Sequence, residues 1–145
     1  TRGGEKPTLW TRPANTALIG RTRLANTLLR KHHIVAILTK NRAAAEQLYT
    51  TRKIDTPTHL LSPADHTMQT GCVILPVYLA KGLEFDAVIG WDVSAATYHG
   101  EADRDILYTL SSRALHELFL IALDTPSPLV TALPADLYQP QSLPV

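Results

Sequence analysis

The chain alternates short, continuous apolar runs with longer stretches in which apolar residues recur at helical spacing. Apolar runs rich in β-branched residues are typical of strands buried on both faces of a sheet, and amphipathic stretches between them are typical of covering helices. Strands are predicted over 33–39, 58–61, 72–79, 85–91 and 118–123, after a short extended segment at 7–10. Helices are predicted over 15–32, 42–52 and 101–116. This order predicts an α/β domain with a mainly parallel sheet flanked by helices.

Local signals between these elements predict caps, turns and loops. Asn41 is a good N-cap for the second helix. Residues 62–71 are turn-rich and predict a surface loop, whereas 80–84 form a charged connection between two strands. Four prolines lie between Asp124 and Gln141, at 126, 128, 134 and 140, so the tail is predicted to be irregular apart from a turn at 135–138.

Composition indicates one globular domain over 1–145, because 45% of the residues are apolar and 19% are charged. No apolar run approaches the roughly 18 residues that a membrane-spanning helix needs. The single cysteine, Cys72, excludes an internal disulfide framework and, without an apolar leader at the start of the chain, predicts a cytoplasmic protein. The first residue is Thr1 and the sole methionine is Met68, which predicts a piece of a longer protein.

The net charge of +1 conceals two halves of opposite sign. Residues 1–53 carry a net charge of +9 and residues 54–145 carry −8. Such asymmetry favours a basic face that meets phosphate or an acidic partner. Basic helices that simply face solvent would give the same pattern.

The usual signatures of a self-sufficient active site are absent from the sequence. There is no Gly-x-x-x-x-Gly-Lys-Ser/Thr phosphate loop, no Gly-x-Gly-x-x-Gly fingerprint and no Gly-x-Ser-x-Gly nucleophile motif. Two other segments, at 80–89 and 107–115, place charged residues next to apolar runs that are predicted to be buried. The loops at the carboxyl ends of parallel strands gather at one sheet edge, where ligands bind. Glu84 can accept hydrogen bonds from ribose hydroxyls, and Arg113 can offer a planar fork to phosphate oxygens.

These segments resemble motifs of the UvrD-like superfamily 1 helicases. Ala80-Lys-Gly-Leu-Glu-Phe-Asp is similar to motif V within 80–89, and Tyr-Thr-Leu-Ser-Ser-Arg-Ala is similar to motif VI within 107–114. Residues 34–40 resemble motif IV. Between the motif IV region and the strand at 72–79 that leads into motif V lie only the 31 residues 41–71, so the accessory domain that UvrD inserts there is predicted to be absent. The missing insertion, Lys40 in motif IV and the opening segment 2–7 together resemble the HelD or helicase IV branch more closely.

The resemblance implies a motor of two RecA-like domains with ATP and Mg²⁺ in the cleft between them. This chain resembles the second domain, a P-loop NTPase-type fold without its own P-loop, so ATP and Mg²⁺ would be bound mostly by an N-terminal RecA-like domain. Alone, the chain is predicted not to hydrolyse ATP. The implied functional residues fall into three groups: Arg113 as the arginine finger, Glu84, Gly82 and Lys40 as nucleotide contacts, and Lys81 and Tyr78 as nucleic-acid contacts. A buried core position for Tyr78 is the stronger expectation.

The implied function is that of the C-terminal motor domain of an ATP-dependent DNA helicase or translocase acting on single-stranded DNA. One alternative is a HelD-type ATPase or docking module that associates with RNA polymerase and does not unwind DNA. Another is a RecA-like scaffold with no nucleotide role. None of these alternatives involves a membrane.

Overall fold

A single sheet organises the computed structural model, which describes residues 8–12, 23–50, 58–61, 70–131 and 139–142. Seven strands form it in the order β3-β4-β2-β5-β6-β1-β7, and every neighbouring pair is parallel. The strands are β1 (Thr8–Arg12), β2 (Ile34–Thr39), β3 (Thr58–Leu60), β4 (Gly71–Pro76), β5 (Phe85–Trp91), β6 (Ala114–Leu123) and β7 (Gln139–Ser142). The helices are α2 (Arg42–Thr50), α3 (Glu101–Ser111), α4 (Pro128–Thr131) and a 3₁₀ helix, η1 (Val77–Ala80). Residues 23–29 are also helical.

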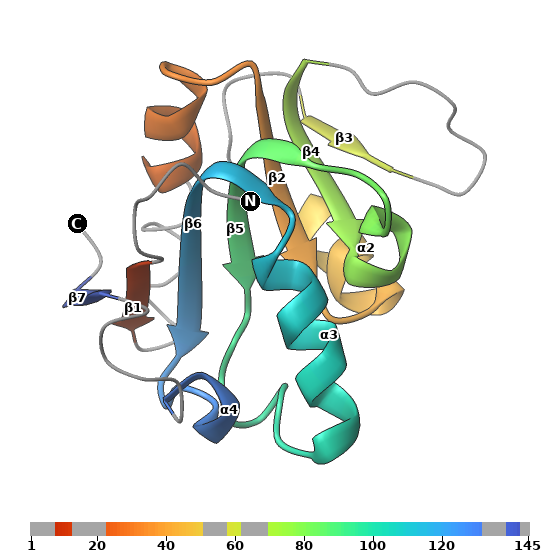
Figure 1. The fold of residues 1–145 in the computed structure, drawn as a ribbon. Helices are drawn as coiled ribbons and strands as arrows, with labels where there is room; N and C mark the ends of the chain where they lie inside the picture. Colours follow the sequence, from red (N-terminus) through yellow and green to blue (C-terminus); the bar gives the residue numbers. More distant parts are fainter. Residues whose placement is uncertain (1–7, 13–22, 51–57, 62–69, 132–138, 143–145) are drawn as a thin grey trace.

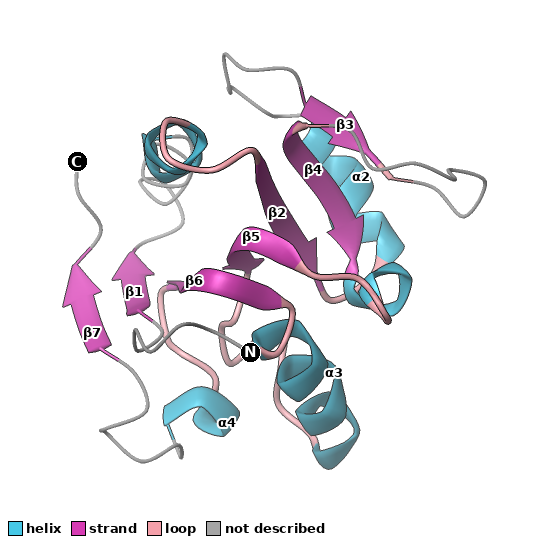
Figure 2. Ribbon diagram, turned by 45° about the horizontal axis from the view of Figure 1, so that its top comes forward, coloured by secondary structure: helices cyan, strands magenta, loops and turns pink. Residues whose placement is uncertain are grey.

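Both faces of the central sheet are buried, because successive side chains of a strand point to opposite faces. In β2, Ala36 and Leu38 belong to the apolar cluster that includes α3. Val35 and Ile37 belong to the cluster that includes α2 and helical residues 23–29. Helices therefore lie on both sides of the sheet, as Figures 1 and 2 show. The predicted α/β fold with a parallel sheet is confirmed, and it is RecA-like.

The strand predicted over 72–79 is shorter than expected. It begins at Gly71 and ends at Pro76, whose backbone pairs with Thr39 at the end of β2. Proline has no N–H to donate to a sheet ladder. The next four residues, Val77–Ala80, turn into η1, which leads over the end of β2 toward β5.

The helix predicted over 101–116 ends at Ser111. Two serine hydroxyls donate to carbonyls of the last helical turn at 2.9 Å, from Ser111 to Leu107 and from Ser112 to Thr109. Such bonds compete with the regular helical pattern. The chain from Ala114 onward pairs with β5, so Leu115, which lies within the predicted helix range, belongs to β6. Pairing with a central strand outweighs the local helical pattern.

The tail after Asp124 was predicted to be irregular, and this prediction is wrong in part. Ser127 and Pro128 open α4, where the Ser127 hydroxyl accepts a hydrogen bond from the Leu129 N–H at 3.1 Å. Further on, β7 pairs with β1. The turn predicted at 135–138 lies outside the described residues, as do 15–22 of the first helix and most of the predicted 62–71 loop. No helix among the described residues is long and apolar enough to cross a membrane.

Tight packing between α3 and the sheet predicts that Gly90→Ala destabilises the domain. A Cβ at Gly90 would lie 2.9 Å from Leu120 Cδ2 and 3.0 Å from Leu110 Cδ2. Both leucines are fully buried, so overpacking should lower the free energy of unfolding by about 1 to 3 kcal/mol. Urea unfolding of both proteins measures this difference. Gly100→Ser is the control, because a Cβ there meets no atom within 4 Å, and equal losses in the two variants would contradict the prediction.

Candidate functional site

The motif V segment forms a turn that leads into β5. After η1, the Leu83 N–H donates to the Ala80 carbonyl at 3.0 Å. Gly82 between them has a φ of 81°, in the left-handed region that favours glycine. A Cβ at Gly82 would meet no atom within 4 Å, so the backbone angle, and not lack of space, requires glycine here. The turn leaves the side chains of Lys81 and Glu84 exposed.

The motif VI arginine lies directly against this turn. Arg113 follows the end of α3, and its Nη1 donates to the Leu83 carbonyl at 3.4 Å, while Nη2 donates to Ser112 Oγ at 3.1 Å. A main-chain hydrogen bond also joins the two segments, since the Phe85 N–H donates to the Arg113 carbonyl at 2.9 Å. The two segments that resemble motifs V and VI are therefore joined through both side chain and backbone.

The guanidinium of Arg113 is not fully satisfied in this arrangement. Its Nε is buried and has no hydrogen-bond acceptor among the described residues. An unsatisfied buried donor costs about 1 to 3 kcal/mol. Apart from this buried group, each Nη keeps one hydrogen beyond its described contact.

The structure brings Arg113 and Glu84 together at one edge of the sheet. Phe85 is aligned with Ala114 at the start of β5 and β6, so the residues that precede them are neighbours. This is the edge formed by the amino ends of the strands. Glu84 lies on a connection between two strands and Arg113 follows a helix, as expected, but η1 carries the chain back across the sheet before β5 begins. Both residues therefore lie away from the carboxyl-end edge, where parallel sheets usually bind ligands.

Lys40 lies at the opposite edge. It follows the carboxyl end of β2, and its Nζ is 3.0 Å from Asp103 Oδ1 and 2.7 Å from the Thr97 carbonyl oxygen. The same ammonium group lies 5.7 Å from the centre of the Tyr98 ring. A strand of six residues spans about 20 Å, so Lys40 is not brought to Arg113 and Glu84.

Asp103 fixes the start of α3 beside Lys40. Its Oδ2 accepts hydrogen bonds from the His99 N–H at 3.0 Å and the Gly100 N–H at 3.5 Å. The bond from His99 is the largest cause that lowers the pKa of Asp103, burial opposes it, and Lys40 lowers it further. Burial also raises the pKa of the Tyr98 hydroxyl, with Asp103 and Asp92 adding to the effect. This edge is therefore an internally paired network.

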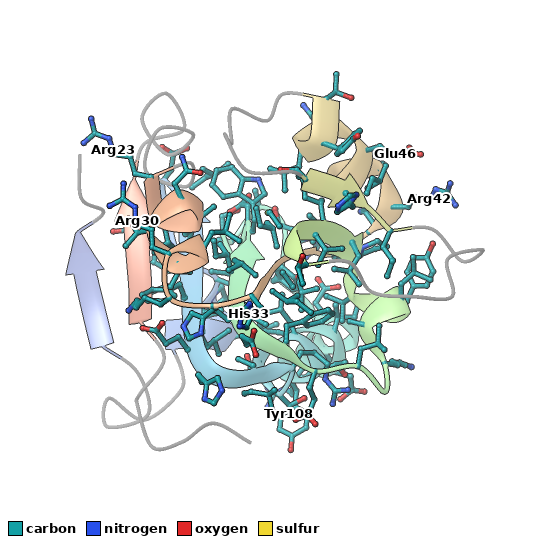
Figure 3. The ribbon with its side chains drawn as sticks, turned by 90° about the horizontal axis from the view of Figure 1, so that it is seen from above. Arg23, Arg30, His33, Arg42, Glu46 and Tyr108 are labelled. Carbon is teal, nitrogen blue, oxygen red and sulfur yellow. The ribbon has the colours of Figure 1, made fainter. Side chains whose placement is uncertain are left out.

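Tyr78 is exposed, which contradicts the stronger expectation of a core position. It lies on η1, and 50% of its surface is accessible. Lys81 follows directly after η1, three positions from Tyr78, and is also exposed. Nearby, Arg42 and Glu46 of α2, labelled in Figure 3, are joined by a 3.3 Å ion pair. The Glu46 bond is the main cause that raises the pKa of Arg42, and a hydrogen bond with Tyr78 contributes.

Three residues of these networks were not predicted from the sequence: Asp103, Ser112 and Asp92. Asp103 had a local signal, because an acidic residue three positions after Gly100 is typical of a helix start. Ser112 had no signal beyond its place next to Arg113. Asp92 accepts bonds from the Ser94 and Leu123 N–H groups at 2.9 and 3.0 Å, and the second of these crosses 31 positions of the sequence. No group of three or more His, Cys, Asp or Glu side chains that could hold a metal ion occurs within the described ranges.

Comparisons with known proteins agree with this architecture. The family model of the UvrD-like helicase C-terminal domain matches residues 71–121. No curated protein sequence matches the chain. One solved structure, the C-terminal domain of a possible DNA helicase from Lactobacillus plantarum WCFS1, superimposes with a TM-score of 0.84 at 32% identity. That match covers 94% of this chain and 86% of the other.

A second solved structure is far more distant. It is the Arterivirus nonstructural protein 10 helicase in complex with DNA, with a TM-score of 0.49 and 10% identity, and the match covers 94% of this chain but 35% of the viral protein. At that level the likeness supports no conclusion about this chain. The bacterial match and the family model agree, and together they show that the chain belongs to the UvrD-like helicase C-terminal domain family.

Proposed function

We propose that this helicase-type motor domain is the C-terminal domain of an ATP-dependent DNA helicase or translocase, and that it completes the ATP site of an N-terminal RecA-like domain. The observation that carries the proposal is the juxtaposition of Arg113 and Glu84 at the amino ends of two neighbouring strands. A permanent cation and a carboxylate at one exposed edge match the two ends of a nucleotide, the phosphates and the ribose.

Arg113 acts on the phosphates in this proposal. Its guanidinium carries five N–H donors, of which the described contacts occupy two. The remaining donors suit the oxygens of a transferring phosphoryl group, whose developing charge an arginine finger stabilises. The phosphate loop and the Mg²⁺ ligands come from the N-terminal domain, and Mg²⁺ neutralises phosphate charge when ATP is bound. Closure of the two domains brings Arg113 to the phosphates, and repeated closure moves the pair along single-stranded DNA.

Glu84 accepts hydrogen bonds from a ribose hydroxyl, and the turn at Gly82 fixes where that carboxylate leaves the backbone. Lys40 is not part of the proposed nucleotide site, because it lies at the other sheet edge and is paired with Asp103. Tyr78 and Lys81 form the proposed contact with nucleic acid. An exposed ring and an exposed cation three positions apart suit stacking on a base and attraction to its phosphate. Association with RNA polymerase remains the alternative.

We expect Arg113→Ala in the full-length parent protein to lower the kcat for ATP hydrolysis by at least about a hundredfold, while the affinity for ATP changes little. The reason is that the lost contact is strongest in the transition state. Steady-state ATP turnover with and without single-stranded DNA measures the effect. Arg104→Ala is the matched control, because Arg104 is an exposed arginine on the same helix, paired with Glu101 at 3.0 Å. Unchanged turnover in Arg113→Ala would refute the motor proposal.

Glu84→Ala is expected to reduce the preference for ATP over its 2′- and 3′-deoxy analogues by about tenfold, because a lost hydrogen bond to the ribose removes the basis for discrimination. The ratio of kcat/KM values for ATP and each analogue measures this preference. Glu101→Ala, an exposed glutamate at the far end of α3, serves as the control. A preference that is the same in Glu84→Ala and the wild type would remove Glu84 from the nucleotide site.

Tyr78→Ala is expected to weaken binding of single-stranded DNA by about 1 to 3 kcal/mol, whereas Tyr78→Phe retains the stacking ring and the affinity. Fluorescence anisotropy with a labelled oligonucleotide at several salt concentrations measures binding, and Lys81→Ala should reduce its salt dependence. Tyr108→Ala is the control, because Tyr108 is 75% exposed and lies on α3, as Figure 3 shows. Binding to RNA polymerase without binding to DNA would favour the docking alternative.

A further inference from the structure

The hydroxyl of Ser112 is the nearest side-chain partner of the Arg113 guanidinium among the described contacts. Its Oγ lies 3.1 Å from Arg113 Nη2 and 2.9 Å from the Thr109 carbonyl oxygen. The guanidinium has only donors and the carbonyl has only lone pairs, so the direction of both bonds is determined. Ser112 donates its proton to Thr109 and accepts the bond from Arg113.

This arrangement holds the side chain of Arg113 at two points. Ser112 accepts from Nη2 on one side, and the Leu83 carbonyl of motif V accepts from Nη1 on the other. Ser112 is itself fixed, because its backbone N–H donates to the Tyr108 and Thr109 carbonyls at 3.1 and 3.2 Å. An arginine side chain otherwise loses much rotamer freedom when it meets a ligand. The fork is therefore oriented before any ligand arrives.

We propose that Ser112 is a positioning residue for Arg113, and that its hydroxyl keeps the guanidinium poised over the motif V turn. The inference rests on the proposed function, because it assigns Ser112 to the same phosphate-facing site. One hydrogen on each Nη remains available while the two anchoring bonds persist. Anchoring and phosphate contact are thus compatible, and loss of the anchor lowers the rate by lowering the fraction of correctly oriented arginine.

Ser112→Ala in the full-length parent protein is expected to lower the kcat for ATP hydrolysis about tenfold, with the KM for ATP changed by less than about twofold. Ser112→Thr restores the hydroxyl and should recover most of the rate. Ser111→Ala is the matched control, since the neighbouring hydroxyl also bonds back to a helix carbonyl, that of Leu107 at 2.9 Å. Equal effects of Ser111→Ala and Ser112→Ala, or no rescue by threonine, would overturn the assignment.

The double variant shows whether Ser112 acts through Arg113. In an Arg113→Ala background, Ser112→Ala should cause no further loss of kcat, because the group that it orients is gone. A further loss of about tenfold would show that Ser112 acts independently, and would overturn the proposal.

A spectroscopic measurement separates this inference from the proposed function. In ¹H–¹⁵N NMR spectra of the isolated chain, a doubly anchored guanidinium should rotate slowly about its Cζ–Nε bond, and Ser112→Ala should accelerate that rotation. If Arg113→Ala leaves ATP turnover unchanged, the proposed function fails, whereas the NMR result still decides whether Ser112 holds the guanidinium. Unchanged rotation in Ser112→Ala would refute the anchor even if Arg113 proves essential for turnover.

Discussion

The hydrogen bond from the Phe85 N–H to the Arg113 carbonyl, 2.9 Å long, is the contact on which the candidate site depends. It joins the first residue of β5 to the residue just before β6, which lies 28 positions further along the sequence. Because β5 and β6 are neighbouring parallel strands, the segments that lead into them lie side by side at the amino-end edge of the sheet. The motif V turn and the motif VI arginine therefore share a single geometry, and the guanidinium contact with the Leu83 carbonyl reinforces it.

Burial of the sheet on both faces makes that geometry rigid. The central strands are apolar at almost every position, so each contributes side chains to both clusters. Strands buried in this way cannot shift register without exposing or overpacking their neighbours. The helix α3 is fixed at both ends, by Lys40 and Asp103 at its start and by Ser112 at its end. Arg113 therefore follows a helix whose two ends are both held in place.

The two sheet edges have different electrostatic character. At the carboxyl edge, Lys40 is paired with Asp103 and Asp92 accepts bonds from two backbone N–H groups. At the amino edge, Lys81 and Glu84 are exposed and Arg113 keeps a buried Nε without an acceptor among the described residues. Groups that satisfy one another stabilise the fold, whereas Arg113 keeps donors that no described residue satisfies, which is the basis of its proposed role.

The sequence by itself determined the α/β class, the apolar strands and the two charged segments, because periodicity and continuous β-branched runs are local consequences of burial. The prediction for 85–91 matches β5 residue for residue. Tertiary structure alone decided where α3 ends, that the polar segment Gln139–Ser142 pairs with β1, and that Tyr78 is exposed. It also decided which edge carries Glu84 and Arg113 and that Lys40 lies at the other. Each of these features depends on backbone pairing between segments far apart in the sequence. A local sequence pattern carries no information about how strongly such distant segments stabilise one another.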